Sequence, residues 1–187
     1  FNIEFANGID YTPSYERYDS NLLTGCVNIY NSTLNKVSIS IRNSKCEDGV
    51  NIVRSSGTVE SLYINDSLFD GADFDYSKIT LNNIEIINSL NDCIDVSKGS
   101  YLFETLKLNK CMDKGISIGE ESNVNIENII SRDTNIAVAV KDSSKVDIKN
   151  AKIDNTEYCI QMYRKKENFN SSYLKIQKLE CALGKIY

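Results

Sequence analysis

Aspartates and a lysine gather in the middle of the chain, and their types and spacing suit acid–base chemistry. The central set is Asp73, Asp75, Asp95 and Lys114. Carboxylates that lie close together can serve as general acid and general base, because crowding raises the pKa of one of them. A lysine beside them can stabilise a developing negative charge or, when desolvated, abstract a proton. We therefore predict these four residues as the candidate catalytic set.

A second group of charged residues flanks this set and is predicted to bind the substrate. Its members stand just before a predicted strand or on the turn after one, and they are Asp92, Asp113, Glu120, Lys141, Asp142, Arg164 and Lys165. The basic stretch 164–166 suits a phosphate or carboxylate of an anionic polymer. Charged turn residues are also common on any solvated solenoid surface, and for each aspartate taken singly that interpretation stays open.

The repeat that positions these residues is a short strand in which apolar and polar residues alternate. It recurs at 27–29, 50–52, 74–76, 94–96, 116–118, 138–140 and 160–162. A second strand of the same kind follows each first one, and each is too short to form a core alone. We expect an all-β fold, a right-handed parallel β-helix (solenoid) of about seven coils of roughly 20–24 residues over 22–187. Segment 1–21 breaks the repeat and is predicted as an N-terminal cap or the remnant of a preceding domain.

This alignment places Asp75 and Asp95 at the same position of adjacent coils. Their backbones would then lie about 5 Å apart. Two like charges at that distance need a cation, a lysine or a shared proton to offset their repulsion. Asp75 and Asp95 are therefore candidate Ca²⁺ ligands, and no other cofactor is expected. Tyr76 falls in the inward column and is expected in the core.

The composition excludes several classes of function. The chain has 187 residues, a net charge of −5 and no histidine. The missing histidine removes the commonest general base and the commonest zinc ligand. The acidic balance argues against a nucleic-acid partner. No stretch has the length of a membrane-spanning helix, and no signal peptide opens the chain.

Six cysteines fall at two positions of the repeat. Cys26, Cys93 and Cys159 share one column, whereas Cys46, Cys111 and Cys181 each lie a few residues past a second strand. Neighbours within a column are about three coils apart, roughly 14 Å, which no disulfide bridges. We therefore expect small, buried, unpaired thiols. Unpaired thiols, with the absent signal peptide, favour a cytoplasmic location.

Five sequence runs follow one another between residues 70 and 170. They are GADFDYS at 71–77, NDCIDVSKGS at 91–100, MDKGISIGEESNVNIEN at 112–128, AVAVKDSSKVDIKN at 137–150 and QMYRKKENF at 161–169. The series resembles the right-handed β-helix domains of the pectate-lyase-like superfamily, and more closely the β-helix regions of bacterial spore-coat kinase-like and surface-polysaccharide proteins. A looser likeness to polygalacturonases is broken at Lys114, which stands where those enzymes carry a histidine. The resemblance implies the fold and a carbohydrate partner, but no particular reaction.

Two functions are compatible with these residues. The first is a carbohydrate-active domain that acts on or binds an anionic polysaccharide through the charged face of the middle coils. If it is an enzyme, it would be a polysaccharide lyase or a glycoside hydrolase. The second is a non-catalytic scaffold or glycan-binding domain of a larger bacterial surface-polysaccharide biosynthesis protein, partnered by a neighbouring domain or a second copy. The sequence does not decide between them.

Overall fold

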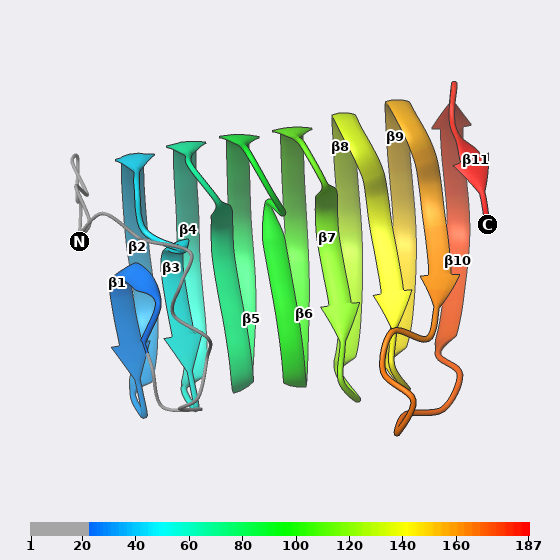
Figure 1. Ribbon diagram of the computed structural model, residues 1–187. Coiled ribbons are helices and arrows are strands. Elements are labelled where there is room, and N and C mark those ends of the chain that lie inside the picture. Colours follow the sequence, from blue (N-terminus) through cyan, green and yellow to red (C-terminus); the bar gives the residue numbers. More distant parts are fainter. Residues whose placement is uncertain (1–22) are drawn as a thin grey trace.

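The chain folds into a parallel β-solenoid of about seven turns, as the computed structural model shows for residues 23–187 (Figure 1). The strands are β1 (Gly25–Tyr30), β2 (Thr33–Ser44), β3 (Asp48–Val53), β4 (Ser56–Ser67), β5 (Asp70–Ser89), β6 (Ile94–Cys111), β7 (Lys114–Gly119), β8 (Asn123–Lys141), β9 (Lys145–Tyr163), β10 (Tyr173–Ala182) and β11 (Lys185–Ile186). The predicted fold class is therefore confirmed. The predicted cap over 1–21 lies outside the described residues. Within 23–187 no helix could cross a membrane.

Each coil contributes three short strand segments, which stack into three columns. In the middle of the solenoid the columns run through Ile94, Ile116 and Val138, through Tyr101, Val124 and Val146, and through Leu106, Ile129 and Ala151. The predicted second strands do not all lie in one column. Those up to residue 108 lie in the third column, the one that contains Leu106. Those at 124–126, 146–148 and 174–176 lie in the second column, the one that contains Val124. Alternate residues of all three columns point inward and form one continuous core.

The first strand of the third coil differs from the prediction by two residues. Asp73, not Asp75, aligns with Asp95, whereas Asp75 aligns with Ser97. The predicted register failed because Phe74 belongs to two overlapping apolar–polar–apolar triplets, 72–74 and 74–76. With the correct triplet, every step of the polar column from Asn51 to Gln161 is the same 22 residues.

Tyr76 is consequently not a core residue, contrary to the prediction. It is 48% exposed and has a φ of 51°. Left-handed residues recur at this bend in every coil from the first to the sixth, at Asn31, Arg54, Tyr76, Lys98, Glu120 and Asp142. The chain turns sharply here, and the side chains of the bend project away from the core.

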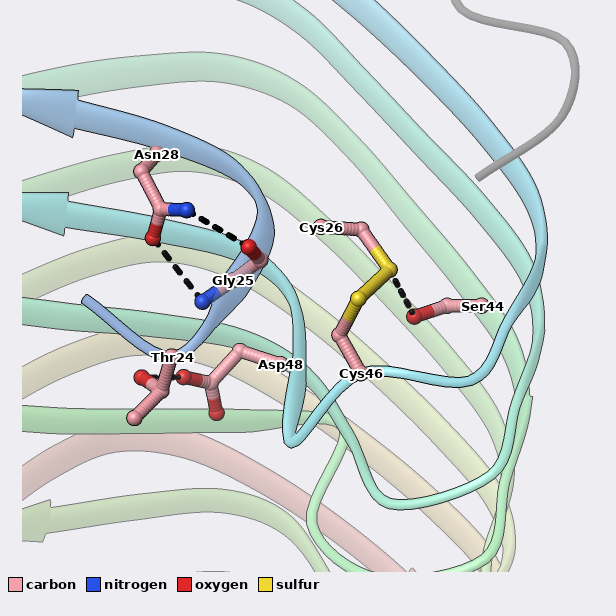
Figure 2. Close-up of a disulfide and its surroundings, with 7 residues drawn as sticks. All are labelled: Thr24, Gly25, Cys26, Asn28, Ser44, Cys46 and Asp48. Atoms are coloured by element: carbon pink, nitrogen blue, oxygen red, sulfur yellow. Dashed lines mark hydrogen bonds between the residues drawn. A yellow bond between two sulfur atoms is a disulfide. The ribbon is translucent and has the colours of Figure 1, made fainter. Parts of the chain in front are cut away.

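Three disulfides bridge the solenoid at one corner, which overturns the prediction of unpaired thiols. They join Cys26 to Cys46, Cys93 to Cys111 and Cys159 to Cys181. Figure 2 shows the first, beside Ser44 at the bend into the next coil. The prediction compared cysteines within a column, three coils apart. The bonds run instead from the start of a coil to its end, where the Cα atoms lie 5.3 to 6.1 Å apart.

These disulfides also remove the ground for a cytoplasmic location, because disulfides persist mainly in oxidising compartments. Only small residues fit at the corner where these disulfides lie. Gly71 lies in the column of Cys93, and a Cβ atom there would come within 2.6 Å of the Cys93 carbonyl oxygen. The close approach of neighbouring coils at this corner explains why the column from Cys26 to Cys159 holds only glycine, alanine and disulfide-bonded cysteine.

Candidate functional site

A pocket of about 190 Å³ opens on the outer side of the first-strand column, over coils three to six. Its lining is strongly charged and consists of Asp70, Asp73, Asp75, Asp95, Ser97, Glu120, Lys141, Asp142, Lys165 and Lys166. Seven of these residues belong to the predicted catalytic and substrate-binding sets. The structure therefore brings together most of the predicted site in one cavity.

Lys141 and Asp95 meet across the middle of this face. Lys141 is only 6% exposed, and its Nζ lies 3.9 Å from Asp95 Oδ1. The lysine stem runs over Gly119, where a Cβ atom would come 2.8 Å from Lys141 Cε. Gly119 thus provides the room that lets the lysine reach back two coils. Asp95 Oδ1 is buried and accepts no hydrogen bond from the described residues.

One wall of the pocket is the loop 164–172, which joins β9 to β10 and hangs below the coils in Figure 1 (orange). Asp142 anchors it, because its Oδ1 accepts the backbone N–H of Lys165 at 2.7 Å and that of Lys166 at 2.9 Å. The Lys166 ammonium also pairs with Glu120. The second oxygen of Asp142, Oδ2, is buried without a hydrogen-bond partner among the described residues.

A column of charged residues begins the first strands beside the pocket. Asp70 Oδ1 accepts the N–H of Asp92 at 2.9 Å, and Asp92 Oδ1 accepts the N–H of Lys114 at 3.0 Å. Burial raises the pKa of Asp70 to about 6 and that of Asp92 to about 7, in the second case against the opposing effect of Lys114. Each carboxylate therefore ties one coil to the next.

Lys114 belongs to this column and does not line the pocket. Its ammonium lies 3.2 Å from Asp92 Oδ1 and also pairs with Asp113. Burial lowers the pKa of Lys114, but the two carboxylates raise it more, so the net shift is upward. A lysine held protonated cannot abstract a proton at neutral pH. This arrangement favours a structural role for Lys114, Asp92 and Asp113.

The geometry on which the Ca²⁺ prediction for Asp75 and Asp95 depended is wrong, since these two residues do not align on adjacent coils. Within residues 23–187 no group of three or more acidic, histidine or cysteine side chains is placed to hold a metal ion. Arg164, predicted to bind substrate, is exposed beyond the pocket lining.

Asp70 and Ser97 line the pocket but were not predicted as site residues, and Lys166, which was predicted only as part of the basic stretch 164–166, lines it as well. A strict 22-residue step links Asp70 to Asp92 and Ser97 to Asp75. The repeat therefore contained the signal for the first two. Lys166 lies in a loop that interrupts the repeat, and no periodic signal indicates its position.

Comparison with known proteins adds no assignment, because no family model, no curated protein and no solved structure matches the chain.

Proposed function

We propose that this chain binds a polysaccharide and holds one sugar residue in the pocket over coils three to six. The observation that carries the proposal is unused hydrogen-bonding capacity in one cavity. Asp95 has a side chain that is 30% exposed, and its Oδ1 has no hydrogen-bonded donor among the described residues. Among the described residues the one ion pair of the Lys141 ammonium is with Asp95, at 3.9 Å, which is longer than a hydrogen bond.

A sugar residue matches these groups because each hydroxyl both donates and accepts a hydrogen bond. Its hydroxyls can donate to the Asp95 carboxylate, whose side chain is 30% exposed, and accept from the Lys141 ammonium. Such hydrogen bonds would bridge two groups that lie too far apart to hydrogen-bond each other, so a ligand that makes them gains affinity. The cavity holds the volume of about six water molecules. That space suits one small polyhydroxylated ring and is too polar for an apolar ligand.

The wider assignment belongs to the same proposal. The motif series over 71–169 resembles β-helices of the pectate-lyase-like superfamily and of bacterial surface-polysaccharide proteins. A glycan chain can lie along a solenoid because successive coils repeat its surface at about 4.8 Å. A binding or scaffolding role in polysaccharide assembly needs no catalytic group and is compatible with this geometry.

A hydrolytic role is the second candidate, and Asp70 favours it. Asp70 lines the pocket, and its pKa of about 6 leaves about a tenth of its carboxyl protonated at pH 7. Glycoside hydrolysis requires one carboxyl that donates a proton and a second that remains ionised. Asp73 or Asp95, in the same lining, would be the second carboxyl of the pair.

The test is a glycan array probed with the wild type, K141M and D95N. K141M keeps the aliphatic stem over Gly119 but removes the ammonium. The matched control is K149M, since Lys149 is an exposed lysine paired with Glu127 on another face. We expect both pocket variants to lose about tenfold or more in affinity and the control to bind as the wild type. Equal binding by all four proteins would refute the pocket as the binding site.

Catalysis is measured separately, on the glycans that bind. New reducing ends report hydrolysis, and absorbance of an unsaturated product reports a lyase; each assay is run with and without Ca²⁺. Hydrolysis that D70N abolishes while glycan affinity persists would support the second candidate. Bound glycans that stay intact under every condition would leave the binding role alone.

A further inference from the structure

A row of alternating aromatic and cationic side chains runs beside the pocket, at the left-handed bend that follows the first strands or, for the first member, at the strand end just before it. Its members are Tyr30, Arg54, Tyr76 and Lys98, and we call them the cation–aromatic row. The row adjoins the pocket because Asp75 and Ser97, which line the pocket, directly precede Tyr76 and Lys98. The left-handed backbone at Arg54, Tyr76 and Lys98 directs these side chains outward.

The members of the row contact one another from coil to coil. The Arg54 guanidinium and the Lys98 ammonium each lie 5.7 Å from the centre of the Tyr76 ring. Arg54 also donates a hydrogen bond of 3.3 Å from Nη1 to the Tyr30 hydroxyl. Both tyrosines remain nearly half exposed. Ring contacts hold the two cations in place while leaving their positive charge unneutralised.

The charge of this row differs from that of the lysines around the pocket. Lys141 and Lys166, which line the pocket, and Lys114 beside it each pair with protein carboxylates, whereas Lys165 in the lining makes no ion pair among the described residues. In the described part of the chain, neither Arg54 nor Lys98 has a carboxylate within ion-pair distance. A negative charge on a ligand is therefore neutralised best at Arg54 and Lys98, and not in the pocket, where carboxylates outnumber lysines.

We propose that the cation–aromatic row binds the acidic groups, carboxylate or sulfate, of the polysaccharide whose sugar residue occupies the pocket. This inference rests on the proposed function. Arg54 and Lys98 lie two coils apart, about 10 Å along the solenoid axis. A polymer that runs parallel to the axis can thus present one acidic group to each.

The two surfaces together orient the polymer. The carboxylates of the pocket repel acidic groups and accept hydroxyl donors, whereas the row attracts acidic groups and can make bidentate contacts through Arg54. The acidic edge of the glycan therefore faces the row and its hydroxyl edge faces the pocket. A chain with acidic groups on both edges would be excluded by repulsion from the pocket.

The experiment is calorimetric titration of three oligosaccharides: a uronate oligomer, a sulfated oligomer and a neutral oligomer. Each is titrated into the wild type and R54Q/K98Q at about 0.01 M and about 0.15 M NaCl, between which the screening length falls from about 30 Å to about 8 Å. The matched control is R42Q. Arg42 makes the same kind of contact, 5.0 Å from the Tyr63 ring, but at a different strand column.

We expect R54Q/K98Q to weaken binding of at least one acidic oligomer by about tenfold or more at low salt and to reduce its salt dependence. Neutral binding should stay unchanged, and R42Q should behave as the wild type. Comparison of the uronate and sulfated oligomers identifies the acidic group.

Two outcomes overturn the inference while leaving the proposed function intact: neutral oligomers bind through Lys141 and acidic ones do not bind, or acidic oligomers bind R54Q/K98Q as tightly as the wild type. If no glycan of any class binds, both proposals fail. Arg54 is an exposed side chain, so an unchanged melting temperature of the double variant is expected and separates lost binding from lost folding.

Discussion

Removal of the Cys93–Cys111 disulfide, in the middle of the solenoid, should lower the free energy of unfolding by about 3 kcal/mol. The bond closes a loop of 18 residues. The chain-entropy relation gives about 3 kcal/mol for a loop of this length, because the cross-link restricts the unfolded chain. Both cysteines are fully buried, so C93A/C111A also loses packing contacts. The expected loss is therefore at least the entropic value.

The assay is urea denaturation of the wild type and C93A/C111A, with intact-mass measurement and thiol titration of each protein before unfolding. The comparison variant is C159A/C181A, which opens a loop of 22 residues at the last coil. Its entropic term is nearly the same, but among the described residues only the two-residue strand β11 pairs with the outer side of this coil, so the coil can open alone. We expect a smaller loss of global stability there.

Free thiols at Cys93 and Cys111 in folded protein prepared without reductant would refute the pairing. A C93A/C111A variant as stable as the wild type would refute the argument that the bond holds the central coils. Addition of reductant to the wild type should reproduce the loss seen in the variant, because reduction opens the same loop.

Three further changes test the packing and charge of the middle coils. G119A places a methyl group 2.8 Å from Lys141 Cε, and titration calorimetry should show glycan affinity about tenfold weaker with the fold retained. Asp92 has a folded pKa of about 7 against an ordinary 3.8, so its neutral form is favoured in the fold. The neutral Asp92 carboxyl contributes its whole stabilisation to the free energy of unfolding below about pH 4, and this stabilisation is lost as the pH rises through 7. The free energy of unfolding of D92N should therefore change less between pH 4 and 8 than that of the wild type, by up to about 4 kcal/mol, as measured by urea denaturation. Y101F removes a buried hydroxyl that donates to the Phe74 carbonyl at 2.8 Å, and denaturation should show a loss of about 1 kcal/mol.

The fold could be predicted because the period of the solenoid is visible in the sequence. Apolar alternation recurs once per coil, and only stacked coils can bury such short strands. The register at the third coil was lost because Phe74 completes an apolar triplet with either Ala72 or Tyr76. Tyrosine has the larger apolar surface, yet the constant step of 22 residues selects alanine. Period, not hydrophobicity, decides the register at such a position.

Prediction of the disulfides required the geometry of a complete coil in addition to the repeat. A coil ends one strand spacing, about 4.8 Å, from where it began. Cysteines at the start and end of a coil, such as Cys93 and Cys111, are therefore within bonding reach, although each is far from the next cysteine of its own column. Spacings near one coil length were visible in the sequence and were the available signal.

The site was predicted where it follows the columns and missed where it does not. Asp73 and Asp95 lie in one column, so their proximity follows from the period once the register is right. The ion pair between Lys141 and Asp95 depends on the empty space above Gly119, which no pattern of residue types indicates. The wall made by loop 164–172 interrupts the repeat. The loop is held by the hydrogen bonds that the backbone N–H groups of Lys165 and Lys166 donate to Asp142 and by the ion pair of Lys166 with Glu120, and no periodic spacing indicates these contacts.

Two kinds of charged group therefore coexist on this face, and their partners distinguish them. Asp92 and Lys114 satisfy each other through a direct ion pair and a backbone hydrogen bond, so this pair has little left to offer a ligand. Asp95 and Lys141 lie too far apart for a hydrogen bond, and Asp95 Oδ1 is buried without one. Such a contact stabilises the fold little, because the two charged groups lie beyond hydrogen-bond distance of each other. The incomplete pairing of Asp95 and Lys141, in a pocket, is the feature that a bound ligand would explain.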